Sequence, residues 1–174
     1  MSIPLIGLAA RLASPGAFRE HLGLRMPEAG SAIRWLLVLA AFIAATDGIN
    51  WLLGRNIVPT FMREAYLTAG WLPLLWFALV IAAPVTEELL FRGLLFGGMA
   101  PSALGPVGAA VVTSLVWAAI HIQYDLFDMG TIFLAGLLLA AVRHSTRSVV
   151  LCILLHSAMN LVATVEAMIA LRGE

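Results

Sequence analysis

Apolar runs close to the length of a membrane span occupy most of this chain. They cover residues 35–53, 67–83, 107–122, 131–142 and 149–171. A helix needs about 20 predominantly apolar residues to cross the hydrocarbon core of a bilayer, which is roughly 30 Å thick. Hydrophobic residues make up 61% of the 174 residues and charged residues only 11%, whereas about 25% of a typical soluble domain is charged. The sequence therefore predicts an all-α, polytopic integral membrane protein whose surroundings are the lipid bilayer, with no nucleic-acid partner.

Residues 85–99 form a further, shorter apolar segment directly after the second run. A single helix from residue 66 to residue 99 would be about 50 Å long at 1.5 Å per residue, well beyond the roughly 30 Å hydrocarbon core. We therefore expect a break near Pro84. The prediction is about six transmembrane or membrane-embedded helices that enclose a polar catalytic cavity, in a single membrane-embedded domain over residues 33–174.

Residues 1–32 carry arginines among Leu, Phe and Met, a composition that suits an amphipathic or juxtamembrane segment on the membrane surface. Basic residues favour the cytoplasmic side of a membrane. Four of them precede the first span, which favours a cytoplasmic position for this segment: Arg11, Arg19, Arg25 and Arg34. Arg143 and Arg147 flank a later short loop. That loop falls inside if residues 85–99 continue the preceding helix or only dip into the membrane, and outside if they cross it separately.

Two adjacent carboxylates, Glu87 and Glu88, lie in the otherwise apolar segment around residues 83–99. An ionised group in the hydrocarbon costs roughly 2.5 kcal/mol or more, so an intramembrane acid indicates a function and a partner. Arg92 follows Glu88 by four residues, the spacing of a helical ion pair. Glu87 would then point about 100° away around the helix and be available for chemistry. Equally, all three could form a buried ion network that only holds helices together.

Further polar side chains lie in two other apolar runs. His121 ends the third run one turn after Trp117, and His156 and Asn160 form an i, i+4 pair in the last run. Alone, each has an ordinary structural explanation, as an interfacial residue or as an interhelical hydrogen bond. Together with the acid pair they suggest hydrolysis of a peptide bond, because a glutamate can take a proton from water and histidine and amide groups can stabilise an oxyanion.

These residues form three motifs that resemble those of a known family. Residues 87–92 match a Glu-Glu-x-x-x-Arg motif, residues 117–121 resemble Phe-x-x-x-His with Trp in place of Phe, and residues 156–160 match His-x-x-x-Asn. In this order they resemble the CAAX protease and bacteriocin-processing family, glutamic-type intramembrane proteases related to the Ras-converting CAAX endoprotease. The likeness extends from about residue 66 to the end of the chain.

The resemblance implies a role for each motif residue. Glu87 would be the general base and His121 would position the attacking water. His156 and Asn160 would form the oxyanion hole. The supporting residues would be Glu88, Arg92 and Trp117. The expected activity is that of an intramembrane endopeptidase acting on a membrane-anchored protein or peptide, at a carboxy-terminal anchor, a sorting signal or a CAAX-like end, in the cell membrane of a bacterium or archaeon.

Three alternatives remain open from the sequence. A member of the same family without turnover could act as an immunity or interaction protein. A small transporter would also use buried acids and histidines, although the paired interrupted helices of transporters are not evident. A zinc-dependent variant could take Glu87, His121 and His156 as ligands. The chain has no His-Glu-x-x-His helix and an asparagine amide suits an oxyanion better than zinc, so we expect metal-free catalysis without a cofactor.

The remaining polar groups are expected to be structural. Asp47 and Asn50 lie one turn apart near the end of the first run and suit hydrogen bonds to a neighbouring helix. Asp125 and Asp128 are expected in a solvated loop close after His121. Cys152 is expected to be a small core residue.

Overall fold

The computed structural model describes residues 18–172, and that part of the chain is helical without strands. The N-terminal residues 1–17, which belong to the predicted juxtamembrane segment, lie outside the described range. The separate helices are α2 (Phe18–Leu22), α3 (Ala29–Leu52), α4 (Thr60–Thr68), α8 (Gly105–Ala119), α9 (Leu126–Thr146) and α10 (Val149–Arg172). Between α4 and α8 lies one long helix, Leu72–Met99. It comprises α5 (Leu72–Phe77), η1 (Ala78–Ala82), α6 (Ala83–Glu88), η2 (Leu89–Leu95) and α7 (Phe96–Met99).

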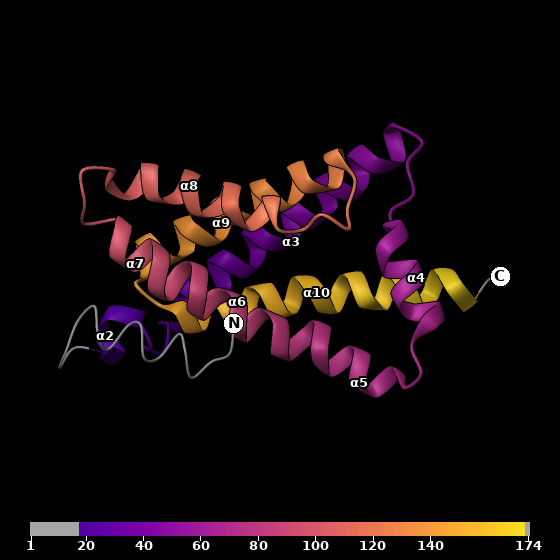
Figure 1. Ribbon diagram of the computed structural model, residues 1–174, viewed down its shortest axis with the longest axis horizontal. Helices are drawn as coiled ribbons and strands as arrows, with labels where there is room; N and C mark the ends of the chain where they lie inside the picture. Colours follow the sequence, from indigo (N-terminus) through magenta and orange to yellow (C-terminus); the bar gives the residue numbers. More distant parts are fainter. Residues whose placement is uncertain (1–17, 173–174) are drawn as a thin grey trace.

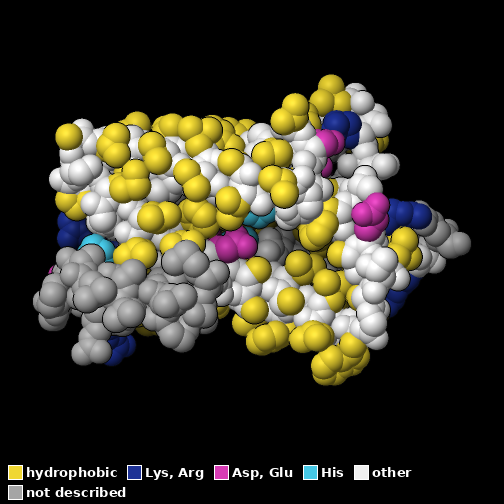
Figure 2. Space-filling model, viewed as in Figure 1, with side chains coloured by type: hydrophobic (Ala, Val, Ile, Leu, Met, Phe, Trp, Pro, Cys, Tyr) yellow, Lys and Arg dark blue, Asp and Glu magenta, His cyan; other side chains and the backbone are white. Residues whose placement is uncertain are grey.

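Four of the described helices are long and apolar enough to cross a membrane: Ala29–Leu52, Leu72–Met99, Leu126–Thr146 and Val149–Arg172. Gly105–Ala119 is apolar but shorter. Side chains such as Leu37, Trp51 and Val107 are largely exposed, and Figure 2 shows hydrophobic side chains spread over most of the visible face. A surface of this kind faces lipid. The all-α membrane fold is thus confirmed, whereas the expected count of six helices is not.

The predicted break near Pro84 is wrong. The helix runs through Pro84 and begins at Leu72, because the chain already turns at residues 69–71 after α4. Its 28 residues are about 42 Å long at 1.5 Å per residue, and tilt accommodates a helix of this length in the bilayer. Pro84 cannot donate a backbone hydrogen bond. The segment just before it, η1, is a π-helical turn, which is wider than an α-helical one. This turn accommodates the lost hydrogen bond within the helix.

Figure 1 shows how the helices are arranged around α10, which runs through the middle of the molecule. One end holds α2, the turn between α7 and α8 and the turn between α9 and α10. The opposite end holds α4, the loop between α8 and α9 and the end of α10. The core is formed by buried side chains of α3, η2, α8, α9 and α10: Leu39, Phe91, Trp117, Ala135, Leu139, Val142, Leu151, Cys152 and Leu155. Cys152 is a core residue, as expected.

Helix α2 is fixed to this bundle by the turn that follows it. Gly23 has φ +71°, a conformation that glycine adopts without strain. Its carbonyl accepts the Val149 amide at 2.9 Å. The buried Arg143 side chain donates to the Arg92 carbonyl at 3.1 Å and to the His21 carbonyl at 3.3 Å. Arg143 thus ties α2 and η2 to α9.

Candidate active site

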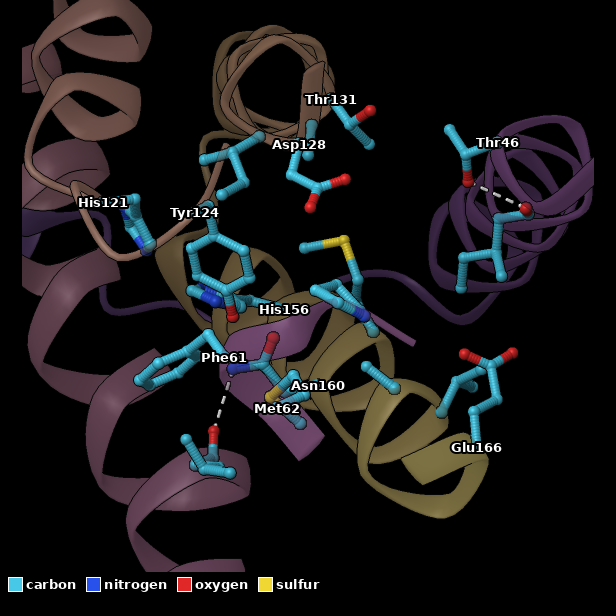
Figure 3. Close-up of a pocket in the computed structure, with 18 of the residues that line it drawn as sticks. Thr46, Phe61, Met62, His121, Tyr124, Asp128, Thr131, His156, Asn160 and Glu166 are labelled. Carbon is cyan, nitrogen blue, oxygen red and sulfur yellow. Dashed lines mark hydrogen bonds between the residues drawn. The ribbon is translucent and has the colours of Figure 1, made fainter. Parts of the chain in front are cut away.

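A cavity of about 360 Å³ opens among α3, α4, α6, α8, α9 and α10. Its lining includes Glu87, His121, His156 and Asn160, the four residues singled out as catalytic candidates, together with Trp117. Figure 3 shows His156 and Asn160 on α10 and His121 directed toward the same space from the end of α8. Side chains from three separate stretches of the sequence therefore meet in one cavity.

Glu87 is held in place by Trp117. The indole Nε1–H donates to Glu87 Oε2 at 2.7 Å, which leaves the other carboxylate oxygen for the cavity. The Trp117 ring is 2% exposed and lies with its centroid 4.5 Å from the Arg92 guanidinium carbon. It also contacts the rings of His121 and His156, each at 5.3 Å between centroids. Trp117 is therefore a donor to Glu87 as well as a packing residue.

Glu88 and Arg92 form a buried cluster behind the cavity. Both side chains are fully buried, and Arg92 Nη1 donates to Glu88 Oε1 at 2.8 Å, as the i, i+4 spacing indicates. His156 Nδ1 donates to the same oxygen at 2.9 Å, and Arg92 Nη2 donates to the Gly136 carbonyl at 3.1 Å. The cluster links the long helix to α9 and α10. Glu87 does not join it, so the two adjacent glutamates lie in different environments.

The orientation of His121 follows from a backbone contact. Its Nδ1 lies 2.6 Å from the Trp117 carbonyl oxygen, and a carbonyl can only accept, so Nδ1 carries the proton. In the neutral ring Nε2 is then an acceptor. One residue, Trp117, therefore positions both Glu87, through its side chain, and His121, through its main chain.

Asn160 is engaged by the long helix. Its Nδ2 donates to the Leu79 carbonyl at 2.9 Å. In η1 the backbone bonds connect residues five apart, since the Ala83 amide donates to the Ala78 carbonyl. The next such bond would join residue 84 to the Leu79 carbonyl, and Pro84 has no N–H to make it. Asn160 supplies the missing donor, which leaves its second amide hydrogen for the cavity.

Comparison with known families agrees with this geometry. The family model described as Type II CAAX prenyl endopeptidase Rce1-like matches residues 69–162, more than half of the chain, and the match includes all three motifs. The chain belongs to this family. Searches of the curated proteins and of the solved structures found no significant match to this chain. Rce1-like proteins are membrane proteases, so membership supports intramembrane endopeptidase activity in general. Together with the apolar helices it identifies a multi-pass integral membrane protein.

A zinc-dependent variant of this Rce1-like site was one of the alternatives left open by the sequence. Among the described residues, no three side chains of His, Cys, Asp or Glu converge to hold a metal ion. The Nδ1 atoms of His121 and His156 are both engaged with protein acceptors. Both Nε2 atoms remain able to accept a hydrogen bond or to ligate. Metal-free catalysis therefore stays a prediction, and the chemistry proposed below uses no metal.

The sequence analysis missed Tyr124, which lines the cavity of the Rce1-like site. Its ring lies 6.0 Å from that of His121 and 5.2 Å from that of Phe61, between centroids. Burial raises the pKa of Tyr124 to about 12, and the charges of Asp128 and Glu87 add to this effect. The phenol therefore keeps its proton at neutral pH. The available signal was its position, three residues after the motif histidine.

Acidic residues also line the cavity. Asp47, Asp128 and Glu166 contribute from α3, α9 and α10. Asp125 caps the N-terminus of α9, since its Oδ1 accepts the Phe127 and Asp128 amides at 2.9 Å. Arg55 Nη2 lies 2.6 Å from Asp125 Oδ2, and this hydrogen bond holds the pKa of Asp125 below its usual range. The expected solvated loop is therefore tied to the segment that follows α3.

Proposed function

We propose that this Rce1-like protease hydrolyses a peptide bond of a membrane-anchored protein or peptide, with Glu87 as the base that activates water. One observation carries the proposal. A carboxylate with one oxygen open to the cavity, two histidines and an amide line a single space inside a bundle of apolar helices. Glu88 and Arg92 would support this arrangement from behind, because Glu88, paired with Arg92, accepts the His156 Nδ1–H.

In the first step Glu87 takes a proton from a water molecule, and the water oxygen bonds to the carbonyl carbon of the substrate. Such general base catalysis typically contributes about 10²- to 10⁴-fold to the rate. His121 Nε2, an acceptor in the neutral ring, holds the second hydrogen of the same water. The Trp117 indole keeps the Glu87 carboxylate directed at that position.

The carbonyl oxygen becomes an oxyanion in this step and needs hydrogen-bond donors. The second amide hydrogen of Asn160 supplies one. His156 Nε2 supplies another when both ring nitrogens carry protons, since Nδ1–H is already bonded to Glu88. The carbon–nitrogen bond then breaks, the carbonyl forms again as a carboxylic acid, and protonated Glu87 returns its proton to the leaving amine.

The substrate must enter as an unwound segment, because a helical peptide hides its carbonyls in its own hydrogen bonds. Apolar lining residues such as Phe42, Phe61 and Met62 suit the side chains of a membrane segment. These features fit a carboxy-terminal anchor, a sorting signal or a CAAX-like end. The host membrane would be the cell membrane of a bacterium or archaeon.

The test compares newly formed protein termini, by mass spectrometry, in membranes of cells that carry either the parent protein or Glu87→Gln at equal expression. The proposal predicts termini that appear only with the parent protein. Identical sets of termini, with both proteins folded in the membrane, would favour an immunity or interaction protein of the same fold.

A further inference from the structure

Of the two motif residues in the proposed oxyanion hole, only Asn160 is a donor whatever the protonation state of the site. Asn160 gives one amide hydrogen to the Leu79 carbonyl and has one left. His156 gives its Nδ1 proton to Glu88. In the neutral ring, Nε2 of His156 can only accept. The two motif residues therefore guarantee a single hydrogen bond to the oxyanion, where acyl-transfer sites gain their largest electrostatic stabilisation from several aligned donors.

Tyr124 is placed where a second donor would be needed. In Figure 3 its ring points into the cavity, with the hydroxyl on the side where His156 and Asn160 lie. The ring is fixed by Phe61 and His121, and its backbone amide donates to the His121 carbonyl at 3.1 Å. The hydroxyl makes no hydrogen bond within the part of the chain that the structure describes. The hydroxyl is therefore held in position and remains available to donate a hydrogen bond.

The charge state of the phenol suits donation. Its pKa of about 12 means that the hydroxyl is neutral and protonated wherever Glu87 is an ionised base. A neutral donor also leaves the charge balance around Glu87, Glu88 and Arg92 unchanged.

We infer that Tyr124 is a catalytic residue of this site, whose phenol donates a hydrogen bond to the substrate oxyanion beside Asn160. This inference rests on the proposed peptide hydrolysis. Tyr124 forms or breaks no covalent bond in this role; its hydrogen bond shortens as negative charge develops on the substrate oxygen.

The test measures hydrolysis of the substrate segment identified by the terminus comparison, with purified protein in lipid. Tyr124→Phe keeps the ring and its contacts with Phe61 and His121. Loss of one oxyanion-hole donor lowers kcat by about 10²- to 10³-fold, and KM should change little. The matched control is Tyr66→Phe, because Tyr66 lies on α4 outside the cavity lining and its hydroxyl only accepts from Trp76. Its kcat should stay within about twofold of the parent value.

A second variant separates donation from packing. Replacing Tyr124 with a multiply fluorinated tyrosine preserves the ring and makes the phenol more acidic, so the donor role predicts a new loss of activity at alkaline pH. Parental kcat in Tyr124→Phe, or a fluorinated protein with the parental pH profile, would overturn the role of Tyr124. Glu87→Gln would still be inactive in that case. A parent protein no more active than Glu87→Gln would overturn the proposed hydrolysis itself.

Discussion

At the scale of single residues, Trp117 adds a donor to a motif that carries phenylalanine at this place in the family pattern. Trp117→Phe keeps the aromatic contacts with Arg92 and the two histidines but removes the 2.7 Å hydrogen bond to Glu87. A hydrogen bond to a charged group contributes about 1.5 to 3 kcal/mol. We expect kcat to fall by roughly 10- to 100-fold with little change in KM, together with some loss of thermal stability because the indole is buried in the core. An unchanged kcat would show that Glu87 is positioned without the indole.

Replacing Arg92 should affect stability first, because the contacts of this side chain are structural. Arg92→Ala leaves the fully buried Glu88 with only its contact to His156, and breaking a buried pair by removing one partner costs about 3 to 5 kcal/mol. We expect a clear decrease in unfolding temperature in detergent, with partial loss of folded protein. Arg172→Ala, at the exposed end of α10, is the control and should unfold like the parent. Equal stability of Arg92→Ala and the parent would contradict the structural role.

The spacing of residues in the sequence predicted one contact of the site, the Glu88–Arg92 pair. The spacing of Glu88 and Arg92 correctly indicated a pair on one helical face, and it also separated Glu87 from that pair. The donor role of Trp117 and the position of Tyr124 could not be predicted, because both depend on how α8 and the loop after it lie against the long helix. Sequence spacing describes neighbours within one helix and carries little information on contacts between helices.

At the scale of helices, α8 and α9 pack closely at Gly136. A Cβ atom at Gly136 would lie 2.8 Å from Ser114 Cβ, nearer than side chains tolerate. Gly136 also presents its carbonyl to Arg92. We therefore expect Gly136→Ala to force the helices apart and to destabilise the protein by about 1 to 3 kcal/mol. The measurement is the free energy of unfolding in mixed micelles.

A matched control is available on the same helix. A Cβ atom at Gly130 would meet nothing within 4 Å, so Gly130→Ala changes the helix propensity of α9 without a clash. It should be as stable as the parent or slightly more stable. If both glycine variants behaved alike, the close packing of α8 on α9 would not be a source of stability.

The long helix shows why element boundaries are harder to predict than elements. A proline in an apolar run usually ends or kinks a helix, which favoured a break at Pro84. Here the orphaned Leu79 carbonyl is bonded by Asn160, more than 80 positions later in the sequence. Neighbouring helices can satisfy freed backbone groups in a membrane protein. The carbonyl freed in this turn is thus bonded by a motif residue that lines the cavity, and local sequence gives no sign of this contact.

At the scale of the whole molecule, the continuous Leu72–Met99 helix decides between the two orientations left open by the sequence. It places the turn between α9 and α10 at the same end as α2. Five described arginines then lie at that end, Arg19, Arg25, Arg34, Arg143 and Arg147, and three at the other, Arg55, Arg63 and Arg172. By the positive-inside rule we predict that the first end is cytoplasmic. The cavity, lined by Gln123 and Tyr124, would open toward the opposite side.

Cysteine labelling tests this orientation, because the native Cys152 is buried. Gln123→Cys and Ser102→Cys introduce exposed thiols at the two ends of the bundle. An impermeant maleimide added to intact cells should label position 123, whereas position 102 should react only after permeabilisation. The reverse pattern would place the opening of the cavity on the cytoplasmic side.

The most direct test of the whole account is the rate of peptide hydrolysis by purified protein in lipid, compared between the parent and Glu87→Gln. The substitution keeps the size of the side chain and its bond to Trp117 but removes the base. Loss of a general base predicts a fall in kcat of about 10²- to 10⁴-fold at an unchanged unfolding temperature. A Glu87→Gln protein that cleaves the substrate within a few-fold of the parent rate would contradict glutamate catalysis in this cavity.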